Sequence, residues 1–239
     1  MNSKTGPVWA IVPASGVGHR MQGQKPKQYL PLDGKTIIEH TLDRLLSFDG
    51  IDGVVLVLRP DDRDWQTINY QSEKPLITTS GGELRQHSVF NGLVKLLEQK
   101  FDDPYAMVHD AVRPLVCHAD LRKLIEAAID HSAGALLALP ITDTLKHQDQ
   151  DSNVDRTVPR AGLWRAFTPQ LFKAKLLHRA LEQVIENDCE VTDDASAIES
   201  LGLRPRLVEC NAENIKITWP EDLSLATQIL RRQREENCG

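Results

Sequence analysis

Cysteine is scarce in this chain of 239 residues, and its four copies lie far apart. Cys117, Cys189, Cys210 and Cys238 have neither the close spacing of zinc ligands nor the density of a disulfide framework. Scattered cysteines of this kind are typical of reduced thiols in the cytosol. We therefore expect no structural zinc site.

Long apolar runs are missing as well. No stretch approaches the roughly 18 consecutive apolar residues that a helix needs to span a bilayer. Residues 1–7 are polar, and the apolar run that follows them is too short for the core of a signal peptide. We expect a soluble, cytoplasmic protein with no membrane partner.

An excess of positive charge is the third feature that the sequence lacks. It contains 28 Lys and Arg against 34 Asp and Glu, which gives a formal net charge of −6. A dedicated nucleic-acid-binding protein relies on a broad basic surface, so we expect no nucleic-acid partner. A few converging cations can still bind phosphate in an acidic protein, and a small phosphorylated ligand stays compatible with this composition.

Strand-like apolar runs alternate with amphipathic helical segments along the chain. We expect strands at 8–12, 54–58, 76–79, 105–108, 134–139 and 206–208, and helices at 36–46, 86–98, 121–132 and 221–232. This alternation predicts an α/β fold with a mostly parallel sheet and helices on both faces. In such sheets ligands bind beyond the carboxyl ends of the strands. With 41% hydrophobic residues, the whole of 1–239 can form a single domain.

The segment at about 140–168 breaks this alternation. A polar tract at 147–153 separates two extended pieces, the second of them at 154–159. The pattern predicts a protruding β-hairpin, which buries little surface by itself and therefore indicates a partner subunit. A surface loop without a partner is the alternative.

The motif that says most about function directly follows the first strand. Its small residues are Pro13, Ala14, Ser15, Gly16 and Gly18. Small residues and glycines let backbone N–H groups approach a ligand, and Arg20 and Lys27 add two positive charges beside them. Such a cradle suits a polyphosphate and predicts an enzyme that handles a nucleotide. The alternatives are a tight turn for the glycines and solvated surface positions for the two cations.

The spacing does not fit the G-x-G-x-x-G turn of dinucleotide-binding proteins. Met21 occupies the place of the third glycine, and Pro26 interrupts the helix that should follow.

Two further clusters follow later strands. Asp110 and Arg113 come after the strand at 105–108, where a carboxylate can bind ribose hydroxyls or assist a magnesium ion that bridges phosphates. The alternative for Asp110 is a turn cap, and we expect His109 to be structural. Gly81 and Gly82 expose backbone groups suited to reading a base edge, or simply form a turn.

Two late segments are ambiguous on their own. Residues 192–196 can be a helix N-terminus with acidic residues in its first turn. Residues 214–218 can be an edge strand that carries a solvated lysine.

Taken together, these segments resemble the 2-C-methyl-D-erythritol 4-phosphate cytidylyltransferase family over nearly the whole chain. The matching motifs are Pro-Ala-x-Gly-x-Gly-x-Arg-Met at 13–21, Pro-Lys-Gln-Tyr at 26–29, Gly-Gly at 81–82 with Arg85 and Ser88, His-Asp-Ala-x-Arg-Pro at 109–114, Asp-Thr-x-Lys at 143–146, Thr-Val-x-Arg at 157–160, Leu-Trp at 163–164, Thr-Pro-Gln at 168–170, Thr-Asp-x-Ala-Ser at 192–196 and Asn-Ile-Lys-x-Thr at 214–218. So many spaced matches are far more specific than any one of them.

The resemblance implies a Rossmann-like nucleotide-diphospho-sugar transferase fold, a homodimer joined by exchanged β-arms and dependence on Mg²⁺. It implies transfer of CMP from CTP to 2-C-methyl-D-erythritol 4-phosphate, giving 4-diphosphocytidyl-2-C-methyl-D-erythritol and pyrophosphate in non-mevalonate isoprenoid biosynthesis. The acceptor phosphate is itself the nucleophile, so no general base or catalytic triad is expected. The barrier lies in joining two anions, which cations and Mg²⁺ address.

The resemblance also assigns roles to residues by position. Arg20 and Lys27 would stabilise charge on the attacked phosphate, while Lys216 and the Arg160 of a partner's arm would position the acceptor. The rest of the acceptor pocket would consist of Asp110, Arg113, Thr144, Thr168 and Thr192. CTP would be held by Pro13, Ala14, Ser15, Gly16, Gly18, Gly82, Glu83, Ser88, Asp110 and Ala111. No metal ligand is assigned.

Some positions depart from the family pattern. They are Ser15 and Val112 in place of alanine, and Glu83, Pro159 and Glu213 in place of aspartate. These changes leave the cations intact and bear on acceptor affinity and arm geometry more than on the type of reaction. Two alternatives stay open: a ribitol-5-phosphate cytidylyltransferase of the same fold, and a non-catalytic nucleotide-sensing module.

Overall fold

A computed structural model describes residues 6–16 and 25–236 of the chain. Its centre is a seven-stranded sheet with the order β11-β7-β10-β6-β1-β4-β5. The strands are β1 (Val8–Pro13), β4 (Gly53–Leu58), β5 (Leu76–Ser80), β6 (Tyr105–Val108), β7 (Ala135–Pro140), β10 (Trp164–Lys173) and β11 (Arg206–Glu209). All neighbours pair in parallel except β10, which is antiparallel to both β6 and β7. The expected mostly parallel α/β sheet is therefore confirmed.

The central strands are apolar on both faces because helices cover both. In β1, Ala10 and Val12 belong to one buried cluster, whereas Trp9 and Ile11 belong to a second cluster across the sheet. Such a continuous apolar run is typical of parallel strands with two covered faces. It places the end of β1, and the small residues after it, in the middle of a rigid core.

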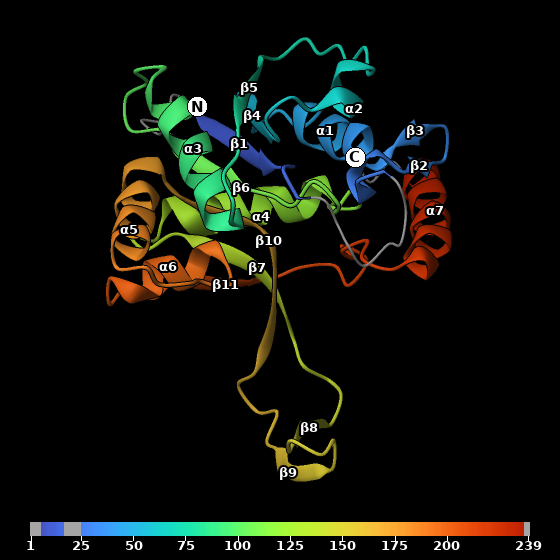
Figure 1. Cartoon of the computed structure of the whole chain (residues 1–239), viewed down its shortest axis with the longest axis vertical. Coiled ribbons are helices and arrows are strands. Elements are labelled where there is room, and N and C mark those ends of the chain that lie inside the picture. The colour runs from blue at the N-terminus through green and yellow to red at the C-terminus, as the bar shows by residue number, and fades with distance from the viewer. Residues whose placement is uncertain (1–5, 17–24, 237–239) are drawn as a thin grey trace.

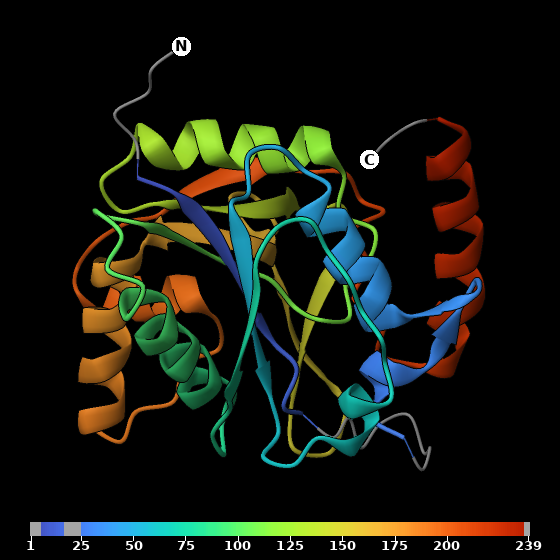
Figure 2. The ribbon, with the colours of Figure 1, turned by 90° about the horizontal axis from the view of Figure 1, so that it is seen from above.

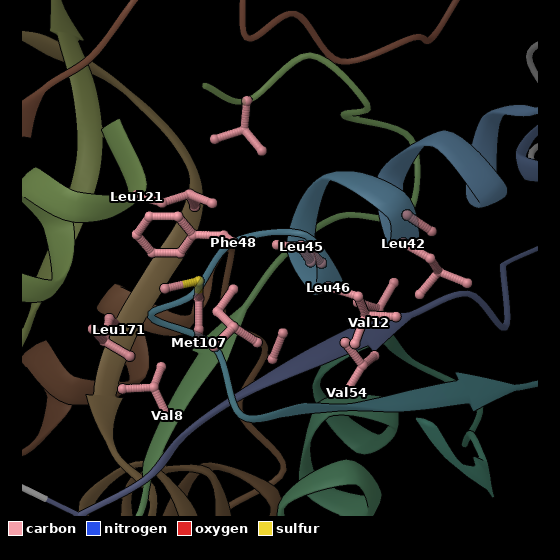
Figure 3. Packing of buried hydrophobic residues seen from close by; sticks show 14 of the residues in the cluster. Val8, Val12, Leu42, Leu45, Leu46, Phe48, Val54, Met107, Leu121 and Leu171 are labelled. Carbon is pink, nitrogen blue, oxygen red and sulfur yellow. The ribbon is translucent and has the colours of Figure 1, made fainter. Parts of the chain in front are cut away.

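Helices form the outer layers (Figure 2). They are α1 (Ile37–Leu46), α2 (Arg63–Gln66), α3 (Arg85–Leu97), α4 (His118–Ile129), α5 (Ala174–Glu186), α6 (Asp194–Ser200) and α7 (Pro220–Glu235). Residues of α1 and α4 pack in the first cluster, and residues of α3, α5 and α6 pack in the second. Figure 3 shows Val12 and Val54 of neighbouring strands beside Leu42 and Leu46 of α1.

A third cluster lies beside the sheet. It joins α7 to the short hairpin of β2 (Pro31–Leu32) and β3 (Lys35–Thr36), which follows the 3-10 turn η2 (Lys27–Tyr29). Val112 and Ile217 belong to the same cluster, and the Ile217 N–H donates to the Val112 carbonyl. The segments that follow β6 and β11 are thus held together near η2.

The expected helix boundaries are close to the observed ones. The Thr36 side chain and Glu39 form a capping box at α1, which fixes the start of that helix. The helix expected at 121–132 instead begins at His118 and ends at Ile129. Residues 214–218 are not in a strand, which removes the edge-strand alternative for them. Asp193 caps α6, in agreement with the N-terminus expected there.

The predicted hairpin projects from the rest of the molecule (Figure 1). Strands β8 (Leu145–Gln148) and β9 (Val154–Val158) pair in antiparallel fashion at its tip. Nearly all of its side chains are exposed, and Val154 is 64% exposed. We refer to residues 140–168 as the arm. Within residues 6–16 and 25–236, none of the helices has the length and apolar character that a membrane span requires.

Candidate active site

A cavity of about 220 Å³ opens at the carboxyl ends of β1 and β6, the edge where an α/β sheet is expected to bind ligands. We call it the nucleotide cavity. It is lined by Pro13, Ala14, Ser15, Gly16, Lys27, Gln28, Gly82, Glu83, Leu84, Arg85, Asp110, Ala111, Val112 and Lys216. The structure therefore brings together most residues that the sequence had linked to CTP, and Lys27 with them.

A second cavity of about 230 Å³ is lined by five of the seven residues that were predicted from the sequence to bind the acceptor. We call it the acceptor cavity. It is lined by Arg85, Asp110, Arg113, Ala166, Phe167, Thr168, Gln170, Thr192, Asp193 and Lys216. Arg85, Asp110 and Lys216 line both cavities, so the two spaces meet at these three side chains.

Gln28 holds the loop after β1 in place. Its side-chain amide donates to the carbonyl of Ala14 at 2.7 Å and to that of Gly16 at 3.2 Å. The Ala14 N–H in turn donates to the carbonyl of Val57 in β4. Gln28 was not predicted to be a site residue, although it lies next to Lys27 in the Pro-Lys-Gln-Tyr motif.

Ser88 lies behind the nucleotide cavity and is fully buried. Its hydroxyl is 2.8 Å from the hydroxyl of Ser15 and accepts a hydrogen bond from the Gly82 N–H at 3.1 Å. A Cβ atom on Gly81 would come within 2.7 Å of the Ser15 Cβ, so this close approach requires glycine. The departure at Ser15 thus provides a partner for Ser88, which supports residues 81–84, the glycine loop, from the side away from the cavity.

Asp110 is buried among three cations. Its carboxylate lies 2.8 Å from the Lys216 ammonium, 3.4 Å from Arg113 Nε and 3.6 Å from Arg85 Nε. Burial alone would raise the pKa of Asp110, but Arg85, Lys216 and Arg113 together outweigh it and hold this pKa well below its usual range. Asp110 is therefore ionised at neutral pH, and the cluster around it keeps an excess of positive charge.

Arg113 and Asn214 join the segments that surround the acceptor cavity. Arg113 Nη1 donates to the Asn214 carbonyl at 2.7 Å, and its guanidinium lies 4.7 Å from the ring centroid of Phe167. The Asn214 side chain donates to the carbonyl of Thr168, whose hydroxyl accepts from the Asp110 N–H. Side chains from three distant parts of the sequence are thereby fixed relative to one another.

Two predicted acceptor residues lie elsewhere. Thr144 and Arg160 are exposed on the arm, and the Arg160 guanidinium donates to the carbonyl of Thr142. Neither residue lines the nucleotide cavity or the acceptor cavity of its own chain. Gly18 and Arg20 lie outside the described residues.

His109 is fully buried, and its Nε2 is 3.0 Å from the carbonyl of Arg113. Burial lowers the pKa of His109 to about 4, from an ordinary value of 6.5. Because the unfolded chain binds this proton more readily, stability is lost as pH falls from about 6.5 to about 4, by about 3 kcal/mol at most. His109 is therefore a structural residue, as expected, in the fold around Asp110.

We expect His109→Gln to remove this acid-sensitive part of stability. The glutamine amide can still donate to the Arg113 carbonyl but does not titrate. The measurement is the free energy of unfolding in urea at about pH 7 and about pH 4.5 for both proteins. If the free energy of unfolding falls equally in the parent and the variant between these two pH values, another group causes the acid sensitivity.

The sequence matches known proteins over almost its full length. The family model described as 2-C-methyl-D-erythritol 4-phosphate cytidylyltransferase, IspD, matches residues 8–232. A protein of that name from Aliivibrio fischeri is 43% identical over 229 residues, which cover 96% of each chain. Another from Pseudomonas putida is 45% identical over 221 residues, which cover 92% of this chain and 94% of the relative.

The fold leads to the same family. The crystal structure of the Francisella tularensis 2-C-methyl-D-erythritol 4-phosphate cytidylyltransferase superposes with a TM-score of 0.81 at 33% identity. The match covers 93% of this chain and 99% of that one. Full-length agreement in both sequence and fold leaves one conclusion: the chain belongs to the 2-C-methyl-D-erythritol 4-phosphate cytidylyltransferase family.

Proposed function

We propose that CTP occupies the nucleotide cavity, that the acceptor phosphate occupies the acceptor cavity, and that the two react where Arg85, Asp110 and Lys216 line both. The enzyme is a nucleotidyltransferase that transfers CMP from CTP to 2-C-methyl-D-erythritol 4-phosphate in the non-mevalonate route to isoprenoids. The observation that supports this arrangement is that Arg85, Asp110 and Lys216 line both cavities.

The chemistry follows from bringing two anions together. An oxygen of the acceptor phosphate attacks the α-phosphorus of CTP, and a new P–O bond forms. The bond from the α-phosphorus to the bridging oxygen breaks, and pyrophosphate leaves with that electron pair. No proton has to be removed from the nucleophile, so positioning and charge stabilisation account for the catalysis.

The cations that line the two cavities support this mechanism. Lys27 lines the nucleotide cavity and is proposed to stabilise the charge that develops on the transferred phosphoryl group, together with Arg20. Lys216 lines both cavities and is proposed to orient the acceptor phosphate. The backbone of Ala14, Gly16 and Gly82, where small residues leave the main chain accessible, is proposed to contact CTP.

Magnesium is proposed as the divalent cation of the reaction. Among residues 6–16 and 25–236, no cluster of three or more His, Cys, Asp or Glu side chains could form a metal site built from protein ligands alone. Asp110 and Glu83 do line the nucleotide cavity, and Mg²⁺ is commonly bound by one or two carboxylates together with substrate phosphates. These residues fit a cation that arrives with the triphosphate and neutralises part of its charge.

A homodimer joined by exchanged arms is also proposed. Thr144 and Arg160 are exposed on a projecting arm, away from both cavities of their own chain. A second copy that brings these residues to the acceptor cavity would complete the site. We also propose that the enzyme acts in the cytoplasm, which is consistent with its few and widely spaced cysteines.

The acceptor is tested by measuring pyrophosphate release in the presence of CTP and Mg²⁺. We expect turnover with 2-C-methyl-D-erythritol 4-phosphate to exceed that with ribitol 5-phosphate by at least roughly tenfold in kcat/KM, because the pocket residues match the former family. Equal or faster turnover with ribitol 5-phosphate would assign the second acceptor. Binding of CTP with no turnover on either phosphate would favour a nucleotide sensor.

A further inference from the structure

We infer that Arg85, anchored by Asp194, is a positioning residue that holds the Asp110 carboxylate where the two substrates meet. The inference rests on the proposed function of the two cavities. Arg85 is the first residue of α3 and directly follows the glycine loop of residues 81–84. It lines both cavities, yet no role was assigned to it from the sequence.

Asp194 fixes the plane of the Arg85 guanidinium. Arg85 Nη1 donates to Asp194 Oδ1 at 3.1 Å, and Nη2 donates to Oδ2 at 2.7 Å. The Asp194 side chain is only 1% exposed and lies at the start of α6, 109 residues away in the sequence. A bidentate pair with a buried carboxylate restrains the guanidinium in both position and orientation.

This restraint directs the remaining edge of the guanidinium at Asp110. Arg85 Nε lies 3.6 Å from Asp110 Oδ1, while Lys216 and Arg113 approach Oδ2. Each carboxylate oxygen therefore has its own positive neighbours. Without Arg85, Oδ1 would lose its cation and the carboxylate would be free to turn further toward Lys216.

The consequence concerns the acceptor phosphate. Lys216 is proposed to bind that phosphate, and an Asp110 carboxylate without Arg85 as a neighbour would neutralise more of the Lys216 charge. Arg85 thus keeps Lys216 available by sharing the charge of Asp110. Lysine cannot replace arginine here, because a single ammonium does not provide the planar fork that contacts Asp194 and Asp110 together.

A double-mutant cycle tests this role, with kcat/KM for 2-C-methyl-D-erythritol 4-phosphate measured at saturating CTP. We expect Arg85→Gln to lower kcat/KM by roughly 10- to 100-fold in the parent, because a charge-assisted contact is lost. In an Asp110→Asn background the same change should cost less than about threefold, since the contact on which it acts is already gone. Equal factors in the two backgrounds would overturn the inference.

Further variants separate positioning from folding. Asp194→Asn should reproduce the loss in kcat/KM and should not add to Arg85→Gln. Arg231 on α7 forms a surface ion pair with Asp33, and Arg231→Gln, which removes this pair, should leave kcat/KM unchanged. If Arg85→Gln lowers only the melting temperature and not kcat/KM, Arg85 is structural. A parent enzyme without turnover would instead refute the proposed function.

Discussion

Lys27→Ala is expected to lower kcat by about 100- to 1,000-fold while it weakens CTP binding by less than about fivefold. Lys27 begins η2 and lines the nucleotide cavity. Charge on the transferred phosphoryl group is greater in the transition state than in bound CTP. A cation that addresses this difference contributes mainly to kcat.

The local structure supports a fixed position for the Lys27 backbone. The Lys27 carbonyl accepts from the Leu30 N–H, and the Pro26 carbonyl accepts from the Tyr29 N–H. The neighbouring Gln28 is bonded to the loop after β1. These hydrogen bonds fix the point from which the Lys27 side chain extends into the cavity. A cation placed in advance of the reaction needs less reorganisation during it, and this favours electrostatic catalysis.

Single-turnover rates and a CTP titration of each variant provide the measurement. Lys25→Ala is the matched control, because Lys25 is exposed and its replacement changes the net charge by the same amount. It should react at close to the parental rate. An equal loss of kcat and of CTP affinity in Lys27→Ala would mean that Lys27 binds the ground state, as in a nucleotide sensor.

The sequence alone was sufficient to predict where β1 and β6 end and which residues follow them. The apolar runs at β1 and β6 located the sheet, and parallel strands direct their carboxyl ends to one edge. Ala14 and Asp110 therefore had to lie close together, as they do in the nucleotide cavity. These inferences depend on local patterns and on a general property of α/β folds.

Contacts between distant segments could not be predicted in this way. The pairing of Arg85 with Asp194 depends on how α3 and α6 pack, and no local pattern encodes that packing. The antiparallel β10 was also missed, because Thr168 and Gln170 place polar residues in the middle of this strand and interrupt its apolar pattern. Both features contribute to the acceptor cavity, because Arg85, Thr168 and Gln170 all line it.

Mixed dimers provide the second large expected effect. Arg160→Ala should raise the KM for the acceptor by roughly 10- to 100-fold, because a charged contact with the acceptor phosphate is lost. Lys27→Ala impairs the same reaction at a residue of the nucleotide cavity, which lies in the globular part of the chain. A dimer that combines one subunit of each kind should regain about half of the parental activity, since one of its two sites has both residues intact.

The experiment uses two affinity tags so that only mixed dimers are assayed, at an acceptor concentration below its KM. The matched control combines Lys27→Ala with Asp110→Asn; both residues line the nucleotide cavity of one chain, so neither site is intact and no activity should return. If mixed Lys27→Ala and Arg160→Ala dimers are no more active than the average of the two separate variants, the arms are not exchanged. Restoration in that pair alone would mean that the site requires Arg160 of the second subunit, and that the exposed arm of a single chain is half of a shared structure.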